Sequence, residues 1–212
     1  MKTNTILRML RREKREFITS KELKEICRRL GVKYESAIRH LIPRGHLVRV
    51  FRGIFYVKSL EEDHLGSTKY SHLELVAKGL AVKGVKSWYF GLTTALVLNN
   101  MTHEHFAIDY VLNDVIQRSS PMDIAGYGFV FKKVKSNLLS FGTLENSVRY
   151  SDPEKTILDM VYLDRYGGVS PQKTALNVSE YFEHIDLDKL NKYVEEYPLS
   201  VSTFLEEFIL ER

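Results

Sequence analysis

The sequence has little of the features that mark several special classes of protein. Cys27 is the single cysteine among 212 residues, so no internal disulfide can form, and a reducing cytoplasm is the expected compartment. No apolar run approaches the roughly 20 residues that a membrane-spanning helix needs, and the basic start lacks the apolar core of a signal peptide. With 5 prolines and 12 glycines, the chain is not collagen-like. We therefore expect a globular protein of the cytoplasm with no membrane partner.

The charge of the chain is distributed unevenly along its length. Residues 1–58 contain 16 Lys and Arg but only 5 Asp and Glu, a net charge of +11. The remaining residues contain 15 basic and 22 acidic side chains, a net charge of −7. A basic segment of this kind attracts a polyanion such as nucleic acid, whereas an acidic one repels it. We predict two domains, residues 1–58 and residues 71–212, joined by a polar, aperiodic linker at residues 59–70.

The basic segment has the pattern of three short helices. The first is expected at residues 3–14, and the second begins with a capping box at Thr19 and Glu22 and ends at Gly31. The third is expected at residues 34–42, just before Pro43. Apolar residues recur at i, i+3, i+4 and i+7 in the second and third helices, which predicts a helix-turn-helix. Cys27 belongs to the apolar stripe of the second helix, so we interpret it as a core residue.

Two β-prone runs follow these helices, at residues 47–51 and 54–57. They are separated by Arg52-Gly53, a two-residue hairpin turn. Three helices followed by a hairpin predict a winged helix, whose third helix enters the major groove of DNA. Its hairpin would reach the phosphate backbone. The candidate DNA-binding residues are Lys33, Ser36, Arg39, His40 and Arg44 around the recognition helix, Arg49 and Arg52 in the hairpin, and Thr19 and Lys21 at the start of the second helix.

The acidic remainder has the pattern of a small sheet surrounded by helices. Alternation of apolar and polar residues predicts strands at residues 106–112 and 127–134, with a further short strand at 148–150. Asp152-Pro153 is a helix-start signal, and Ser119-Ser120-Pro121 is expected to form a turn. The overall class is therefore α+β, a winged helix followed by an α+β domain. Further helices are expected at residues 72–82, 92–98, 172–182, 187–195 and 201–210.

These residues resemble the AbiEi family of antitoxins and transcriptional regulators. The likeness covers roughly residues 5–165 and is carried by residues 17–23, Gly31-Val32, 40–56, 89–96 and 150–159. It implies a winged helix that represses its own operon and a second domain that counteracts a companion nucleotidyltransferase toxin, in many members without a stable complex. Double-stranded DNA upstream of its own gene and that toxin are the expected partners. We expect a monomer or weak dimer, with pairing on an inverted repeat as one arrangement.

The sequence gives little support for catalysis. A nucleotidyltransferase needs a Gly-Ser turn and a pair of carboxylates for magnesium, but Gly66-Ser67 lies in the expected linker. The relevant strand reads Asp109-Tyr110, with a tyrosine where the second acid belongs. His103 and His105 lack the additional ligands of a metal site. We expect no enzymatic activity, no cofactor and no metal.

Three other functions stay open at this point. The first is a ligand-responsive winged-helix repressor unrelated to toxins, whose acidic domain binds a small molecule. The second is a nuclease that the winged helix directs to DNA. The third is a winged helix that binds protein, which the solvated polar face of a small helical bundle would also suit.

Overall fold

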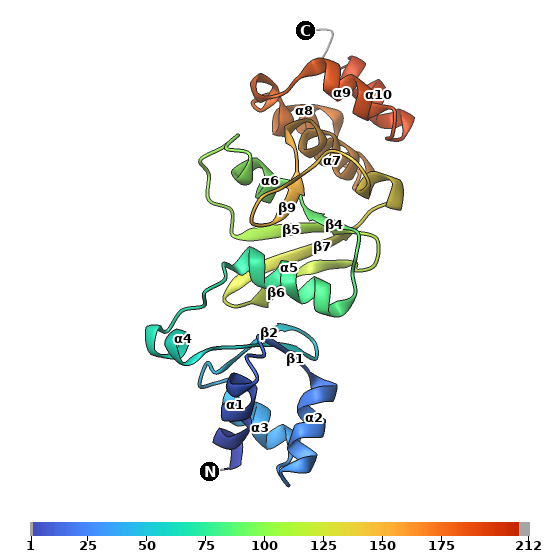
Figure 1. Ribbon diagram of the computed structural model, residues 1–212. Helices are drawn as coiled ribbons and strands as arrows, with labels where there is room; N and C mark the ends of the chain where they lie inside the picture. Colours follow the sequence, from blue (N-terminus) through green and yellow to red (C-terminus); the bar gives the residue numbers. More distant parts are fainter. Residues whose placement is uncertain (1, 208–212) are drawn as a thin grey trace. The chain divides into compact units, whose positions relative to one another are not determined.

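A computed structural model describes residues 2–207 and divides them into two compact units (Figure 1). The first unit extends to Lys86 and also includes Asp123–Tyr127, whereas the second comprises Ser87–Met122 and the chain from Gly128 onward. Both units combine helices with a sheet, so the predicted α+β class is confirmed.

The first unit begins with three helices and a small antiparallel sheet. The Thr19–Glu22 capping box starts the second helix as predicted, and Gly31, with a φ of 61°, follows its end. Each helix and strand expected in this segment is present, together with a short strand that the brief run Phe17-Ile18 did not signal. The elements are α1 (Lys2–Arg12), β1 (Phe17–Thr19), α2 (Ser20–Arg29), α3 (Tyr34–Leu41), β2 (Leu47–Phe51) and β3 (Ile54–Val57), with sheet order β1-β3-β2.

One face of this sheet closes over the three helices. Ile6, Leu23, Leu41 and Phe55 are buried together in the resulting core. Cys27 lies among them with 1% of its surface exposed, which confirms its packing role. Burial raises the pKa of the Cys27 thiol, so the side chain stays protonated and unreactive at neutral pH.

The other face of the sheet is covered by α5 (His72–Lys83), which packs against β2 and β3. A Cβ atom on Gly79 would lie 2.5 Å from Val50 Cγ1 and 2.8 Å from the Phe51 ring, so only glycine permits this close approach. The segment Asp123–Tyr127 belongs to the same unit, and the ring of Tyr127 stacks on His72 with centroids 3.9 Å apart.

The predicted linker at residues 59–70 requires correction. Part of it forms α4 (Leu60–Leu65), which starts with a capping box between Ser59 and Glu62. Glu62 is buried and accepts hydrogen bonds from the Tyr56 hydroxyl and from the Lys69 backbone amide. The polar residues of this segment therefore hold it against the first unit. For the same reason the division between the units falls at Lys86 instead of before residue 71.

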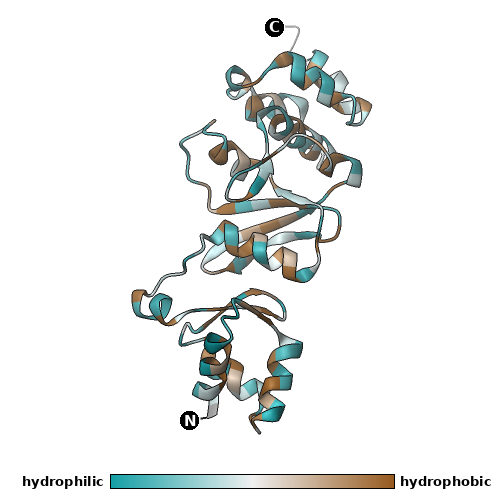
Figure 2. Cartoon of the chain, viewed as in Figure 1, coloured by the Kyte–Doolittle hydropathy of each residue, from teal (hydrophilic) through white to brown (hydrophobic). Residues whose placement is uncertain are grey.

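The second unit contains most of a six-stranded mixed sheet. The strands at the middle of this sheet alternate hydrophobic with hydrophilic stretches, and their hydrophobic stretches are buried (Figure 2). Ser119-Ser120-Pro121, expected as a turn, lies inside the edge strand β6, a position where a proline is tolerated because its missing N–H faces outward. The strands are β4 (Trp88–Phe90), β5 (Ile108–Asn113), β6 (Arg118–Ile124), β7 (Tyr127–Lys133), β8 (Thr143–Glu145) and β9 (Arg149–Ser151), in the order β6-β7-β5-β4-β9-β8.

Helices pack together beside this sheet, and α7 contributes the centre of their shared core. Asp152 caps α7 with Pro153 in its first turn, as predicted, and Ile157 and Val161 are fully buried. Among residues 2–207, no helix is long and apolar enough to cross a bilayer. Residues 208–210 of the last expected helix lie outside the described residues. The helices are α6 (Thr93–Leu98), α7 (Pro153–Tyr166), α8 (Pro171–Ser179), α9 (Leu187–Val194) and α10 (Leu199–Leu205), with short 3-10 turns at Ser136–Leu139 and Phe182–His184.

A buried ion pair lies inside this helical core. Lys155 and Asp159 occupy successive turns of α7, both fully buried, with Lys155 Nζ 3.5 Å from Asp159 Oδ1. The hydroxyls of Tyr89 and Tyr197 donate to the two carboxylate oxygens at 2.8 and 2.7 Å. Lys155 Nζ also lies 4.3 Å from the centroid of the Phe141 ring. The pair is therefore satisfied by protein groups on all sides, which is the condition under which a buried charge is tolerated.

Candidate nucleic-acid interface

The outward face of α3 is polar because its helical spacing turns those residues away from the core. Ala37 is buried against the other helices, whereas Ser36 and Arg39 are exposed. Lys33 precedes the helix, is exposed, and makes no side-chain cap hydrogen bond. Arg39 Nε donates to the backbone carbonyl of Glu35 at 3.4 Å, which leaves its terminal nitrogens directed to solvent.

The end of α3 carries a second polar group. Arg44 Nη1 lies 2.8 Å from His40 Nδ1 and donates to the His40 carbonyl at 3.2 Å. Partial desolvation, and then the nearby cation of Arg44, lower the pKa of His40. The imidazole is therefore neutral at pH 7 with Nδ1 as the acceptor, which places its proton on Nε2. His40 can thus donate a hydrogen bond, while Arg44 remains exposed and charged.

The β2–β3 hairpin carries the remaining two predicted arginines. Arg52 is exposed in the turn, next to Gly53 with its φ of 79°. Arg49 is also exposed, and its guanidinium lies 5.8 Å from the centroid of the Phe55 ring, a distance at which cation and ring attract. Both cations therefore face solvent on the hairpin.

Ser20 joins the hairpin turn to the starts of α2 and α3. Its backbone amide donates to the Gly53 carbonyl at 2.7 Å, and its hydroxyl lies 2.8 Å from the Tyr34 hydroxyl. The turn, the first residue of α2 and the first residue of α3 therefore meet at one point. This junction brings together three of the predicted cations, Lys21, Lys33 and Arg52.

Two roles are expected for Thr19, a helix cap and a phosphate contact, and the structure shows the cap. Its hydroxyl donates to Glu22 Oε2 at 2.7 Å and accepts from the Glu22 backbone amide at 3.3 Å. Hydrogen bonds from the Thr19 amide and hydroxyl lower the pKa of Glu22, so a charged carboxylate sits at the start of α2. This carboxylate would repel a phosphate. Thr19 is therefore a helix cap, and of the two residues predicted at this helix start only Lys21 is exposed.

Two further exposed cations extend this surface and were missed from the sequence. Lys21, Lys24 and Arg28 recur at i, i+3 and i+7 and so share one face of α2, and all three are exposed. Lys24 Nζ lies 5.2 Å from the centroid of the Tyr34 ring at the start of α3. The spacing of these basic residues along the helix is the sequence signal that identifies them.

The cations of this surface differ in pairing from three other basic residues of the same unit. Arg11 pairs with Asp63, Arg15 pairs with Glu13 and Glu22, and Lys69 pairs with Glu16. Across the described part of the chain, no carboxylate forms an ion pair with any of the basic residues predicted to bind DNA. We call the set Lys21, Lys24, Arg28, Lys33, Arg39, Arg44, Arg49 and Arg52 the cationic surface.

The residues considered for catalysis are distributed over both units. Gly66 ends α4 in the first unit, whereas Asp109 lies on β5 in the second. His103 and His105 are both exposed in the loop before β5. Within residues 2–207, no three His, Cys, Asp or Glu side chains are grouped closely enough to hold a metal ion.

Comparison with known proteins gives a likeness of fold. No family model matches the chain, and no curated protein matches it. The fold is similar to the crystal structure of the RV2827C protein from Mycobacterium tuberculosis, with a TM-score of 0.60 and 13% sequence identity. The match covers 97% of this chain and 76% of that chain. The likeness therefore extends over both units and concerns the fold alone.

Proposed function

We propose that this protein is a DNA-binding transcriptional regulator whose first 58 residues act as a winged helix-turn-helix. The order α1-β1-α2-α3-β2-β3 and the sheet order β1-β3-β2 suit that fold, with α3 as the recognition helix and the β2–β3 hairpin as the wing. The tight turn between α2 and α3 suits the helix-turn-helix.

The observation that carries this proposal is the cationic surface. Its side chains are exposed and have no carboxylate partner among residues 2–207, although other arginines and lysines of the same unit do. Exposed, unpaired cations along a helix and the adjacent hairpin match a row of phosphates, because each contact releases a counterion from the nucleic acid.

The chemistry of the individual residues suggests how they divide the work. Arg39 can donate two hydrogen bonds to guanine, and Ser36 and the His40 Nε2 proton are suited to base edges or phosphates. Arg52 and Lys21, placed at the Ser20 junction, are suited to phosphate contacts that set the position of the protein. Arg39 is therefore proposed to read sequence, whereas Arg52 supplies affinity.

We further propose that the chain is an antitoxin of the AbiEi type, which represses its own operon and counteracts a companion nucleotidyltransferase toxin. Its support is the resemblance in sequence, which includes residues 150–159 at the start of α7. In this segment Asp152 caps the helix and Lys155 and Asp159 form the buried pair, so the resembling residues build the core of the second unit. The proposal is that this chain shares both the architecture and the regulatory role of the family that it resembles.

The DNA-binding proposal is tested with Arg39→Ala and Arg52→Ala on the region upstream of the gene and on random DNA. Each substitution is expected to weaken specific binding by about 1–3 kcal/mol. Only Arg39→Ala should reduce the difference in affinity between specific and random DNA. The matched control is Lys133→Ala, an exposed lysine of the second unit, which should change neither. Fluorescence anisotropy at several salt concentrations provides the measurement. Salt-independent binding, or none, would refute the proposal.

The antitoxin proposal is tested by expressing the adjacent gene with and without this chain. Growth arrest by the neighbour alone, relieved by co-expression, is the expected result. Because Arg39→Ala affects operator reading only, it should lose repression of a reporter yet retain the rescue of growth. If induction of the neighbouring gene does not slow growth, the antitoxin proposal is contradicted. If the rescue requires Arg39, DNA binding and toxin neutralisation are not separate functions.

A further inference from the structure

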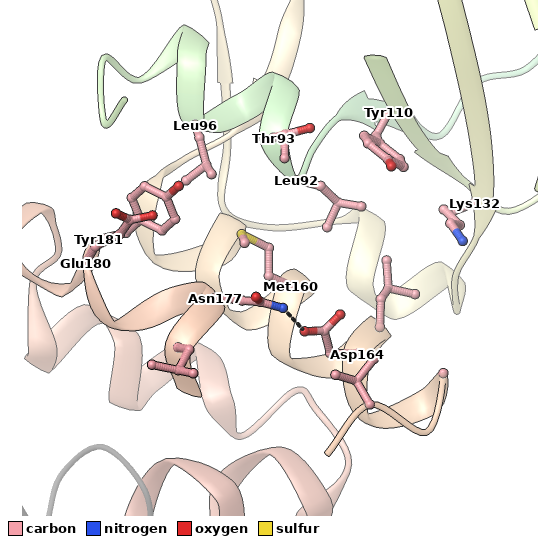
Figure 3. A pocket seen from close by; sticks show the side chains of 14 residues that line it. Leu92, Thr93, Leu96, Tyr110, Lys132, Met160, Asp164, Asn177, Glu180 and Tyr181 are labelled. Carbon is pink, nitrogen blue, oxygen red and sulfur yellow. Dashed lines mark hydrogen bonds between the residues drawn. The ribbon is translucent and has the colours of Figure 1, made fainter. Parts of the chain in front are cut away.

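The second unit contains a cavity of about 600 Å³ between its sheet and three of its helices (Figure 3). This volume is in the range of small-molecule sites. The side chains that line it come from β5, β7, α6, α7 and α8 and from the segments next to them. The apolar part of the lining is formed by Leu92, Leu96, Met160, Leu163, Val169 and Leu176.

One carboxylate of the cavity lies between these apolar side chains. Asp164 Oδ2 accepts a hydrogen bond from Asn177 Nδ2 at 3.0 Å (Figure 3). Throughout the described chain, no lysine, arginine or histidine pairs with Asp164. An amide neighbour satisfies one oxygen without neutralising the charge, so the carboxylate favours a cation that enters the cavity.

The remaining charges leave the lining net negative. Glu180 lies at one end of the cavity and Lys132 at the other (Figure 3). Two carboxylates and one ammonium therefore face the space, and Asp164 lies between the two ends. A cationic group is attracted more strongly than an anionic one in this field.

The backbone next to the cavity is strained. Leu92 has a φ of 55° and a ψ of −137°, a region that residues with a Cβ rarely adopt. Figure 3 shows that this conformation directs the Leu92 side chain into the cavity. The hydroxyl of the next residue, Thr93, is buried with no hydrogen-bond partner among the described residues. Both features lie at the start of α6, beside the cavity, and backbone strain of this kind is concentrated at functional sites.

We propose that this cavity binds organic monoamines with an apolar body, the ammonium group at Asp164 and the hydrocarbon against Leu92, Met160 and Leu163. Asp164 supplies the charge, and its hydrogen bond to Asn177 holds the carboxylate in place. The inference goes beyond the proposed DNA-binding function and does not depend on it.

The test is a series of ligands that share one body and differ in charge: 2-phenylethylamine, 2-phenylethanol and 3-phenylpropanoate. Calorimetric titration of the full chain should give an affinity for the amine about tenfold or more above that for the alcohol, with the carboxylate weakest. In Asp164→Asn the amine should bind no more tightly than the alcohol, whereas the affinity for the alcohol should be unchanged. Asparagine retains an oxygen that accepts from Asn177, so the cavity keeps its shape.

Two further variants separate the site from the fold. Glu145→Gln removes an exposed carboxylate on β8, away from the lining, and should leave the amine affinity unchanged. Leu176→Lys places a cation on a lining position that is 76% exposed. It should lower the affinity for the amine without lowering the melting temperature. The proposal is overturned if the amine does not bind at millimolar concentration, if the carboxylate binds more tightly, or if Asp164→Asn retains the preference for the amine.

Discussion

The cationic surface of the first unit and the helical core of the second differ in how their charged residues are paired. In the first unit, the cationic surface is exposed and lacks carboxylate partners within residues 2–207. In the second, Lys155 and Asp159 are fully buried against each other, and Lys189 pairs with Asp152 and Glu154 at 3.0 and 2.7 Å. Net charge thus identifies which unit is basic. Pairing and burial then show which of its charged side chains can bind a partner.

The largest expected effect comes from breaking the buried pair. Asp159→Ala leaves Lys155 buried without a counterion and removes the acceptor for Tyr89 and Tyr197. We expect a loss of about 3–5 kcal/mol in the free energy of unfolding, because an uncompensated buried charge is strongly destabilising. Urea denaturation followed by circular dichroism measures it.

A double variant distinguishes the effect of the unpaired charge on stability from the effect of the lost side-chain volume. Lys155→Met with Asp159→Leu replaces the pair by apolar side chains of similar volume and should recover most of the lost stability. A double variant as unstable as Asp159→Ala would show that the tyrosine hydroxyls, left without acceptors, dominate instead.

Charge reversal sharpens the comparison between the units. Lys21→Glu, Lys33→Glu and Arg52→Glu together should lower the slope of log affinity against log salt by about 3 on random DNA. The matched control reverses three exposed lysines of the second unit, Lys133, Lys135 and Lys173, and changes the net charge equally. Equal losses in both triple variants would show that total charge, and not the cationic surface, governs binding.

The pH dependence of stability should include a contribution from Glu62. Burial raises the pKa of Glu62, but hydrogen bonds from Tyr56, Ser59 and Lys69 outweigh it and lower the pKa below 4.5. Because the folded pKa lies below that of the unfolded chain, the stabilisation is present above about pH 4.5 and is lost as the pH falls through the folded pKa. Glu62→Gln should cost about 1–2 kcal/mol at pH 7.

The advantage of the native chain over Glu62→Gln should then shrink as urea denaturation is repeated at lower pH. A constant difference between pH 7 and pH 3 would mean that the carboxylate is not held in its charged form by these hydrogen bonds.

The smallest expected effects are those of substituting the helix cap Thr19 and its exposed neighbour Lys21. Thr19→Ala should lower the free energy of unfolding by about 1 kcal/mol, since it removes the cap of α2, and should leave DNA affinity unchanged. Lys21→Ala should do the reverse, with stability within about 0.5 kcal/mol and weaker DNA binding. Thermal melts and anisotropy on the same two proteins measure both. Weakened DNA binding by Thr19→Ala in folded protein would restore the phosphate contact that the sequence suggested.

Local signals explain how much of the fold could be predicted. The start of α2 follows from Thr19 and Glu22, and the hairpin follows from Gly53, because each depends on residues adjacent in sequence. The extent of the first unit depends on Gly79 meeting Val50 and on Tyr127 reaching His72. Such contacts between distant residues leave no local pattern.

The candidate sites also combine features that local sequence predicts with features that depend on contacts between distant residues. The exposure of Arg39 follows from the helical period that buries Ala37, so it could be predicted. The junction at Ser20 depends on Gly53 and Tyr34 together, and the cavity at Asp164 gathers side chains from positions 92 to 181. Both required the folded chain.

The segment Asp123–Tyr127 makes the first unit discontinuous along the chain. During translation, the ring of His72 can find its stacking partner only after residue 127 has left the ribosome. The unit therefore completes its packing only after residue 127 has been synthesised, and a fragment that stops at Lys86 lacks the ring that stacks on His72 of α5.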